Sequence, residues 1–284
     1  FYQCDVDVVG NGKLDIKNDA LVVSTVYKAL KSIGLGKFKI QMSNRKILKG
    51  ILQELNIEND IEVMILIDKY DKIGKEKFTE DLINLVGEEK SNFINKVMEF
   101  SGDNESIISN LKTLTIESEL YKKGVDELEE VIKYLSLFGV DKNFFKIDLK
   151  IIRGLDYYTG TVFEVESIDF KGAIAGGGRY DNLIGKFLGQ QVSAVGFSIG
   201  FERIFSILMQ NGVETKASAD KIAVMYDEGQ VKEAYAIAEK YRAEGKVCSL
   251  YVKPKKMGKF LGKLEERGYK GFVNVSNGDE ISLF

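Results

Sequence analysis

Residues 153–164 read RGLDYYTGTVFE, and the interpretation of the whole chain begins with this stretch. An arginine beside a glycine is followed by two adjacent tyrosines, Tyr157 and Tyr158, and then by a turn. Adjacent side chains on a strand point to opposite faces, so one tyrosine can pack in a core while the other presents its hydroxyl to a cleft. The composition favours a functional site over the alternative, a sheet corner with surface polar groups.

Two glycine-rich motifs lie downstream: residues 175–181 read AGGGRYD and residues 196–203 read GFSIGFER. Three consecutive glycines let a backbone turn sharply or approach a ligand closely, and the first motif is neither a dinucleotide fingerprint nor a P-loop. In the second motif a strand meets a helix start, so Arg203 could reach a phosphate near the strand end. A tight turn and a surface arginine are the respective alternatives.

The first strand, residues 1–9, adds a set of polar side chains at a spacing of two. Gln3, Asp5 and Asp7 alternate with apolar residues, so they share one face of the strand. Such a face can line a pocket, or it can be a solvated sheet surface.

Composition excludes several classes of chemistry. The 284 residues contain no histidine, which rules out a Ser-His-Asp triad, a histidine general base and a histidine metal site within this chain. Six of the 40 basic residues are arginine, and Arg153, Arg179 and Arg203 lie close together in the sequence. A rigid guanidinium fork suits phosphate or carboxylate binding, although chance could also produce this cluster.

The remaining composition indicates a compartment and limits the kind of RNA contact. Cys4 and Cys248 are far apart, which argues against a disulfide scaffold and fits a reducing, cytoplasmic compartment. The net charge of -3 gives no whole-molecule attraction to nucleic acid. The lysines between 253 and 263 could contact RNA phosphates or form a solvated helix face. No apolar run is long enough to span a membrane.

Periodicity predicts three parts along the chain. The first part, residues 1–55 and 147–212, mixes helices with short strands at 146–152, 161–167, 173–176 and 194–199, which indicates an antiparallel sheet. Residues 56–146 have helical spacing and are expected to form an inserted helical domain. Residues 218–284 alternate strand and helix and predict a small parallel sheet. Asp19 and Asn44 are expected to cap helices.

Together these motifs resemble the histidyl-tRNA synthetases, which are class II aminoacyl-tRNA synthetases. Residues 1–7 resemble the second strand of class II motif 2, and residues 153–164 resemble a histidine-specific segment. Residues 175–183 are similar to a second such segment, and residues 196–203 to motif 3. The resemblance implies an α+β fold: an antiparallel sheet flanked by helices, a helical insertion and a C-terminal α/β anticodon-binding domain.

The resemblance also implies a reaction and the residues that serve ATP. Histidine and ATP, with Mg²⁺ on ligands that cannot be assigned, give histidyl-adenylate, and the histidyl group then moves to the 3′ end of its tRNA. Arg153 matches the catalytic arginine that contacts the α-phosphate of ATP. Arg203 matches an arginine on the γ-phosphate, and Gly200 borders the adenine.

Histidine recognition is carried over in the same way. Asp7 and Tyr158 match residues that hold the two imidazole nitrogens. Gln3 and Tyr180 match contacts near the α-amino group. The resemblance completes a histidine-binding set that consists of Gln3, Asp7, Tyr157, Tyr158, Gly176, Gly177 and Tyr180. Side chains of this set should lie around the same cavity as Arg153 and Arg203.

Motif 1, which forms the dimer interface in the class, and the motif 2 arginine would lie upstream of Phe1. The 284 residues alone are therefore expected to be catalytically incomplete, with an incomplete C-terminal domain, and the enzyme is expected to be a homodimer. Two non-catalytic relatives remain as alternatives: the regulatory subunit of ATP phosphoribosyltransferase, and an uncharged-tRNA sensor domain.

Overall fold

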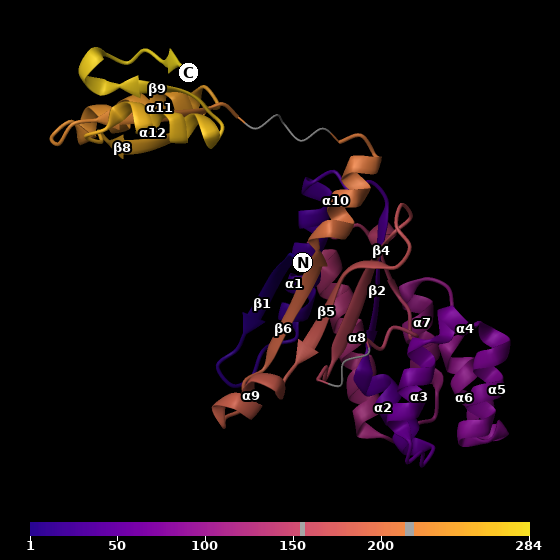
Figure 1. The fold of residues 1–284 in the computed structure, drawn as a ribbon. Helices are drawn as coiled ribbons and strands as arrows, with labels where there is room; N and C mark the ends of the chain where they lie inside the picture. The colour runs from indigo at the N-terminus through magenta and orange to yellow at the C-terminus, as the bar shows by residue number, and fades with distance from the viewer. Residues whose placement is uncertain (154–156, 214–218) are drawn as a thin grey trace. The chain divides into compact units, whose positions relative to one another are not determined.

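The computed structural model describes residues 1–153, 157–213 and 219–284, and it divides into two compact units. Unit 1 is Phe1–Asn211 and unit 2 is Gly212–Phe284 (Figure 1). Gly154, Leu155 and Asp156, within the stretch at 153–164, lie outside the described residues, as do residues 214–218. Within the described residues, no helix is both long and apolar enough to cross a membrane.

Unit 1 is built on a sheet that has six strands among the described residues, in the order β1-β6-β5-β4-β2-β3. All neighbours are antiparallel except β2 and β3, which run parallel. The strands are β1 (Gln3–Val9), β2 (Phe38–Asn44), β3 (Phe145–Ile147), β4 (Thr161–Ser167), β5 (Ala173–Tyr180) and β6 (Ala194–Gly200). The fold class predicted from sequence is confirmed: a mostly antiparallel sheet flanked by helices.

One face of the sheet is buried against helices and forms one of the apolar cores of unit 1. Side chains that pair directly across neighbouring strands share a face, and one such row contains Phe197, Phe163 and Met42, all buried. They pack against two helices, α1 (Lys17–Ser32) and α8 (Glu119–Leu137). Figure 1 shows both helices on one side of the sheet. The opposite face is therefore the one available for a site.

The two predicted helix caps have different outcomes. Asn44 caps α2 (Arg45–Glu54), because its side chain accepts a hydrogen bond from the backbone N–H of Lys46 at 3.0 Å. The prediction for Asp19 is wrong: α1 begins at Lys17, two residues before it. The side chain of Asp15 accepts the hydrogen bond from Lys17 N–H, and Asp19 lies inside the helix with no exposed surface.

Two strand predictions are also corrected. The strand expected at 146–152 is only Phe145–Ile147, and it pairs parallel to β2. The strand expected at 173–176 continues to Tyr180, so Gly176, Gly177 and Gly178 lie inside β5, between β4 and β6, and the alternative of a tight turn is wrong. Glycines in a central strand leave room beside the backbone, and this room becomes part of the site described below.

Helices fill the segment between β2 and β3. They are α2, α3 (Asp60–Asp68), α4 (Tyr70–Ile73), α5 (Lys75–Val86), α6 (Glu88–Met98), α7 (Asn104–Thr113) and α8. Most of them share one apolar cluster, to which α8 contributes Tyr121, Val125 and Leu128. Further along the same helix, Val131 and Leu135 belong instead to the cluster beneath the sheet. The α8 helix is thus part of both cores.

Unit 2 is a small α/β layer. Its described strands have the order β10-β9-β7-β8, with β7 parallel to both β8 and β9, as the sequence predicts. The elements are β7 (Lys221–Tyr226), α11 (Val231–Ala243), β8 (Val247–Val252), α12 (Met257–Glu266), β9 (Tyr269–Asn274) and β10 (Ser282–Leu283). Unit 1 ends with α9 (Leu183–Leu188), β6 and α10 (Phe201–Gln210).

Candidate functional site

The site begins with glycines on the polar face of the sheet. Ser198 of β6 pairs with both Asp5 and Gly176, and Gly196 pairs with both Asp7 and Gly178. Gly176, Gly178 and Gly196 therefore present backbone, not side chains, along two adjacent rows. The sequence supplies a flat floor on which other side chains can lie.

Each of these three glycines lies beneath a candidate site residue. A Cβ at Gly176 would meet Arg153 Nη1 at 2.6 Å, and one at Gly178 would meet the ring of Tyr158 at 2.9 Å. A Cβ at Gly196 would occupy the space of the Asp7 carboxylate. Gly177 differs, because it faces the core side, where the backbone of β6 approaches closely. Any side chain at these positions would displace its neighbour.

Arg153 is held in an unusual backbone conformation, with a φ of 57°. Such a conformation is costly for a residue other than glycine and persists only where the surroundings enforce it. Its guanidinium donates a hydrogen bond to Glu164 of β4 at 2.8 Å, and both side chains are about one-quarter exposed, at 24% and 25%. The guanidinium is thus fixed but remains accessible to a ligand.

Arg153 and Arg203 line one cavity of about 520 Å³. Arg203, near the start of α10, donates a hydrogen bond to the carbonyl of Ala173 and lies over the ring of Phe170. The other described residues that line the cavity are Phe1, Tyr2, Gln3, Ala173, Ile174, Ala175, Gly176, Ser198, Gly200 and Glu202. The structure therefore brings together all three residues predicted to bind ATP, along with Gln3 and Gly176.

The other predicted histidine contacts form a neighbouring group of aromatic rings. The ring centroids of Tyr157 and Tyr158 are 4.4 Å apart, and those of Tyr157 and Tyr180 are 5.8 Å apart. Tyr157 donates a hydrogen bond to the hydroxyl of Tyr158 at 3.2 Å, and Tyr180 donates one to Asp7 at 2.6 Å. These residues come from β1, from β5 and from the segment before β4, and the three strands are labelled in Figure 1.

The surroundings of Tyr158 and Tyr180 keep the hydroxyls of these two residues protonated. Burial, followed by the hydrogen bond with Tyr157, raises the pKa of Tyr158 well above its ordinary value. Burial, followed by the hydrogen bond to the Asp7 carboxylate, raises the pKa of Tyr180. Near neutral pH both groups can therefore act as hydrogen-bond donors.

The expected single cavity is only partly realised. Tyr157 and Tyr158 line a second hollow of about 500 Å³, and among the described residues that line these two hollows Asp7 and Tyr180 do not occur. The link between the two groups is the floor of the site, since Asp7, Tyr158 and Arg153 lie over glycines of neighbouring strands.

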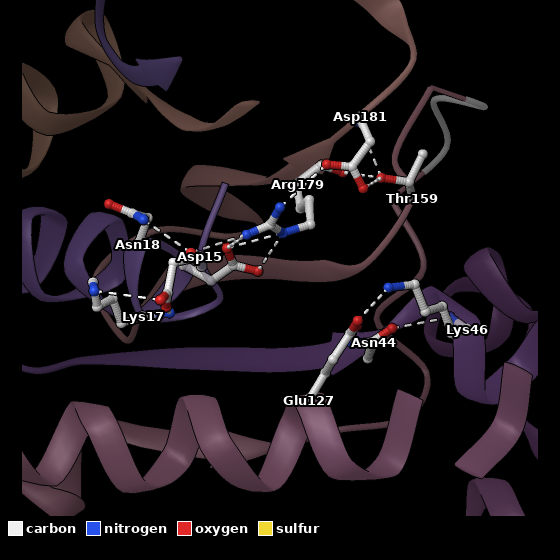
Figure 2. Close-up of polar contacts among 10 residues, drawn as sticks. Asp15, Lys17, Asn18, Asn44, Lys46, Glu127, Thr159, Arg179 and Asp181 are labelled. Atoms are coloured by element: carbon white, nitrogen blue, oxygen red, sulfur yellow. Dashed lines mark hydrogen bonds and ion pairs between the residues drawn. The ribbon is translucent and has the colours of Figure 1, made fainter. Parts of the chain in front are cut away.

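A buried polar network supports the tyrosine segment from below. The side chain of Thr159 donates to Asp181 at 2.7 Å, and its backbone N–H donates to the carbonyl of Arg179 at 2.8 Å. Arg179 in turn forms ion pairs with Asp19 at 2.7 Å and with Asp181 at 3.1 Å. Figure 2 shows how Arg179 joins the start of α1 to the end of β5. The network fixes the end of the segment that presents Tyr157 and Tyr158.

A family sequence pattern described as "Histidyl-tRNA synthetase" matches residues 1–204, which include every candidate residue above. The chain belongs to the histidyl-tRNA synthetase family. Its relatives include a histidine–tRNA ligase of Clostridium acetobutylicum, 46% identical over 99% of this chain and 66% of the relative. Another, from Clostridium tetani, is 39% identical over 91% of this chain and 60% of the relative.

Solved structures agree with this family membership. A histidyl-tRNA synthetase from Nostoc sp. PCC 7120 matches with a TM-score of 0.74 and 32% identity, over 95% of this chain and 65% of that one. A structure from Bacillus halodurans, described as an ATP phosphoribosyltransferase regulatory subunit/histidyl-tRNA synthetase, shares the fold at 20% identity. The chain thus spans about two thirds of the length of these synthetases.

Several residues of the candidate site were missed by sequence reasoning. Gly178 and Gly196 lie under Tyr158 and Asp7, Glu164 pairs with Arg153, and Ser198 accepts a hydrogen bond from Gln3 at 2.6 Å. Gly178, Gly196 and Ser198 share one signal, alternation: each lies two residues from another site residue or from a motif glycine on the same strand, whereas Glu164 has no such neighbour. Only the strand register shows that these positions meet.

Magnesium has no evident protein site here. Among the residues that the structure describes, no three acidic or thiol side chains gather closely enough to hold a metal ion. Magnesium keeps several waters and binds through one or two carboxylates plus substrate phosphates. Magnesium that binds together with ATP therefore needs no such group of three side chains.

Proposed function

We propose that this chain is the major part of a histidine–tRNA ligase, which activates histidine with ATP and transfers it to its tRNA. The observation that supports this proposal most strongly is the cavity shared by Arg153, Arg203 and Gly200, beside a group formed by Asp7 and three tyrosines. Family membership supports it as well. The geometry suits a triphosphate next to a small polar ring.

In the first step the carboxylate of histidine attacks the α-phosphorus of ATP. A new bond forms between the carboxylate oxygen and phosphorus, and the bond to the bridging oxygen of the leaving pyrophosphate breaks. Negative charge grows on the α-phosphate oxygens, and Arg153, fixed by Glu164, would stabilise it. Arg203 would hold the γ-phosphate at the other end of the cavity. The chemistry depends on positioning and charge, which suits a site whose own residues include no histidine.

The hydrogen bonds in the tyrosine group suggest how histidine would be recognised. Tyr158 accepts from Tyr157, so its own proton is free to be donated to the unprotonated imidazole nitrogen. Asp7 uses one carboxylate oxygen for Tyr180, and its other oxygen can accept from the imidazole N–H. A neutral imidazole has one donor and one acceptor. Side chains without both groups would leave Asp7 or Tyr158 unpaired and would be rejected.

In the second step a ribose hydroxyl of the terminal tRNA adenosine attacks the carbonyl carbon of histidyl-adenylate, and AMP leaves. We propose that residues 218–284 contribute to anticodon binding and that residues 56–146 form the helical insertion between the parts of the catalytic core, 1–55 and 147–212. Magnesium would arrive with the phosphates of ATP. A homodimer in the cytoplasm completes the proposal.

The test is histidine-dependent exchange of pyrophosphate into ATP, measured on the protein as it occurs in the cell. Arg153→Ala should lower the exchange rate by about 10²- to 10³-fold, the range for lost charge-stabilising donors. Arg267→Ala, in unit 2, is the matched control and should leave exchange within about twofold. Asp7→Ala should weaken histidine binding far more than ATP binding. A folded protein that binds histidine but shows no exchange would favour a non-catalytic relative.

A further inference from the structure

Arg45, the first residue of α2, is buried at 5% exposure beside the candidate site. Its Nη1 donates hydrogen bonds to the backbone carbonyls of Arg153 at 3.1 Å and of Ile152 at 3.4 Å. Its Nη2 faces the sulfur of Met64 at 3.6 Å. The guanidinium is thus directed at main chain, specifically at the peptide groups that set the conformation of Arg153.

The same residue also contacts the other end of the tyrosine segment. The backbone N–H of Arg45 donates to the carbonyl of Gly160 at 3.0 Å. Arg45 therefore contacts the main chain at Arg153 and again at Gly160, just after Tyr157 and Tyr158. Thr159, between them, is held separately by Arg179 and Asp181.

The stability of α2 does not explain an arginine at this position. The positive end of the helix dipole is at the N-terminus, which favours acidic residues there. The first turn of α2 contains Arg45 and Lys46 and no acidic residue. Lys46 is compensated by an ion pair with Glu127 of α8, which Figure 2 shows. The Arg45 side chain donates instead to main-chain carbonyls of the site.

The backbone of Arg153 needs such support. Among the described residues, only Arg153 and Asn56 combine a side chain with a positive φ, at 57° and 50°. For an arginine this conformation is unfavourable unless surrounding contacts enforce it. Arg45 donates to the two adjacent carbonyls from one nitrogen, Nη1, of a rigid planar group, whereas a lysine ammonium has no such fixed geometry.

We propose that Arg45 is a positioning residue, which fixes the strained backbone of Arg153 and so aims its guanidinium across Gly176 into the cavity. The inference rests on the proposed function for the role of Arg153, and it adds a residue that the sequence motifs do not contain. Arg45 does not touch the substrate in this scheme. It acts through Arg153, and removing it should matter only while Arg153 is present.

The experiment is a double-mutant cycle in the pyrophosphate-exchange assay. A misplacement of about 1 Å can cost about 10²-fold in rate, so Arg45→Met should lower kcat by about 10²-fold while the KM for ATP changes less than about threefold. Arg45→Lys should recover part of this loss. In an Arg153→Ala background, Arg45→Met should lower the rate by less than about threefold further. Lys122→Met, the control at an exposed ion pair on α8, should stay within about twofold of the wild type.

Backbone hydrogen exchange gives a second measurement that does not require activity. Arg45→Met should speed exchange at residues 151–153 and 157–160 while α1 and β6 remain as protected as in the wild type. The positioning role would be overturned if the rate losses of the two single variants multiply in the double variant. It would also be overturned if Arg45→Met speeds hydrogen exchange throughout unit 1. If the wild type shows no pyrophosphate exchange, the proposed function fails instead. In that case the inference is tested by hydrogen exchange at residues 151–153 and 157–160. Exchange rates there that Arg45→Met leaves unchanged would rule it out.

Discussion

Replacing Arg179 with methionine should destabilise unit 1 by several kcal/mol. Asp19 is completely buried, and it accepts three hydrogen bonds from Arg179 at 2.7, 3.1 and 3.1 Å. Methionine fills a similar volume but leaves this carboxylate without its cationic partner. Removing one member of a buried pair typically costs about 3–5 kcal/mol, because the remaining charge stays buried and uncompensated. The whole stability of a domain is about 5–15 kcal/mol.

The assay is urea unfolding followed by circular dichroism, with the transition of unit 1 separated from that of unit 2. For a slope of about 3 kcal/mol per molar urea, the loss corresponds to a midpoint lower by about 1–1.7 M. Lys122→Met is the control, because its ion pair with Glu119 is exposed at both ends, at 46% and 89%. Such surface pairs contribute about 0–1 kcal/mol.

The double variant Asp19→Leu/Arg179→Met decides the reasoning. Replacing both members of a buried pair with apolar groups is often neutral or stabilising, so the double variant should be more stable than Arg179→Met alone. A single variant that loses less than about 1 kcal/mol, or a double variant no better than the single, would show that the pair does not carry the stability assigned to it.

Two further predictions follow from the same region. Gly196→Ala places a methyl group where the Asp7 carboxylate lies, so histidine affinity should fall by about 10- to 100-fold, the value of one hydrogen bond to a charged group, while ATP affinity, measured by calorimetry, stays within about twofold. Burial works to raise the pKa of Asp181, but the hydrogen bond from Thr159 and the charge of Arg179 outweigh it and hold the pKa below its ordinary value. A carboxylate whose pKa is lowered by folding stabilises the fold above about pH 4, and this contribution is lost as the pH falls further. The urea midpoint should therefore drop less steeply below about pH 4 in Asp181→Asn than in the wild type. Equal slopes for the two proteins would contradict this.

Local sequence signals predicted those features that depend on local interactions. Asn44 caps α2 because its side chain reaches an N–H two residues away. The α10 helix begins at Phe201, within the motif where the sequence predicts a helix start. The parallel strands of unit 2 follow from the alternation of strand and helix. In each case the stabilising contact lies within one turn or one connection.

Features that depend on distant partners could not be predicted in this way. Asp19 is of a residue type that often caps helices, but its carboxylate accepts a hydrogen bond from Arg179, 160 residues away. The glycines of β5 look like a turn until β4 and β6 are seen to pair with them on both sides. The side chain of Arg45 reaches a backbone 108 residues further along the chain. No spacing rule within a short window contains these contacts.

The site itself divides in the same way. Arg153, Arg203 and Gly200 belong to motifs with enough local character to be named, and the structure gathers them around one cavity. Asp7 and Tyr180 were named too, but the bond between them joins β1 to β5 across β6.

The α8 helix has a consequence for how this family can change. One half of it packs among the helices and the other half packs beneath the sheet. Its 19 residues span roughly 28 Å, at about 1.5 Å for each residue. A recombination that exchanged the whole region between β2 and β3 would remove α8, which covers the sheet, along with the other inserted helices. Viable exchanges should therefore break within the connection before α8, so that the inserted helices can diverge while this one continues to match the strands it covers.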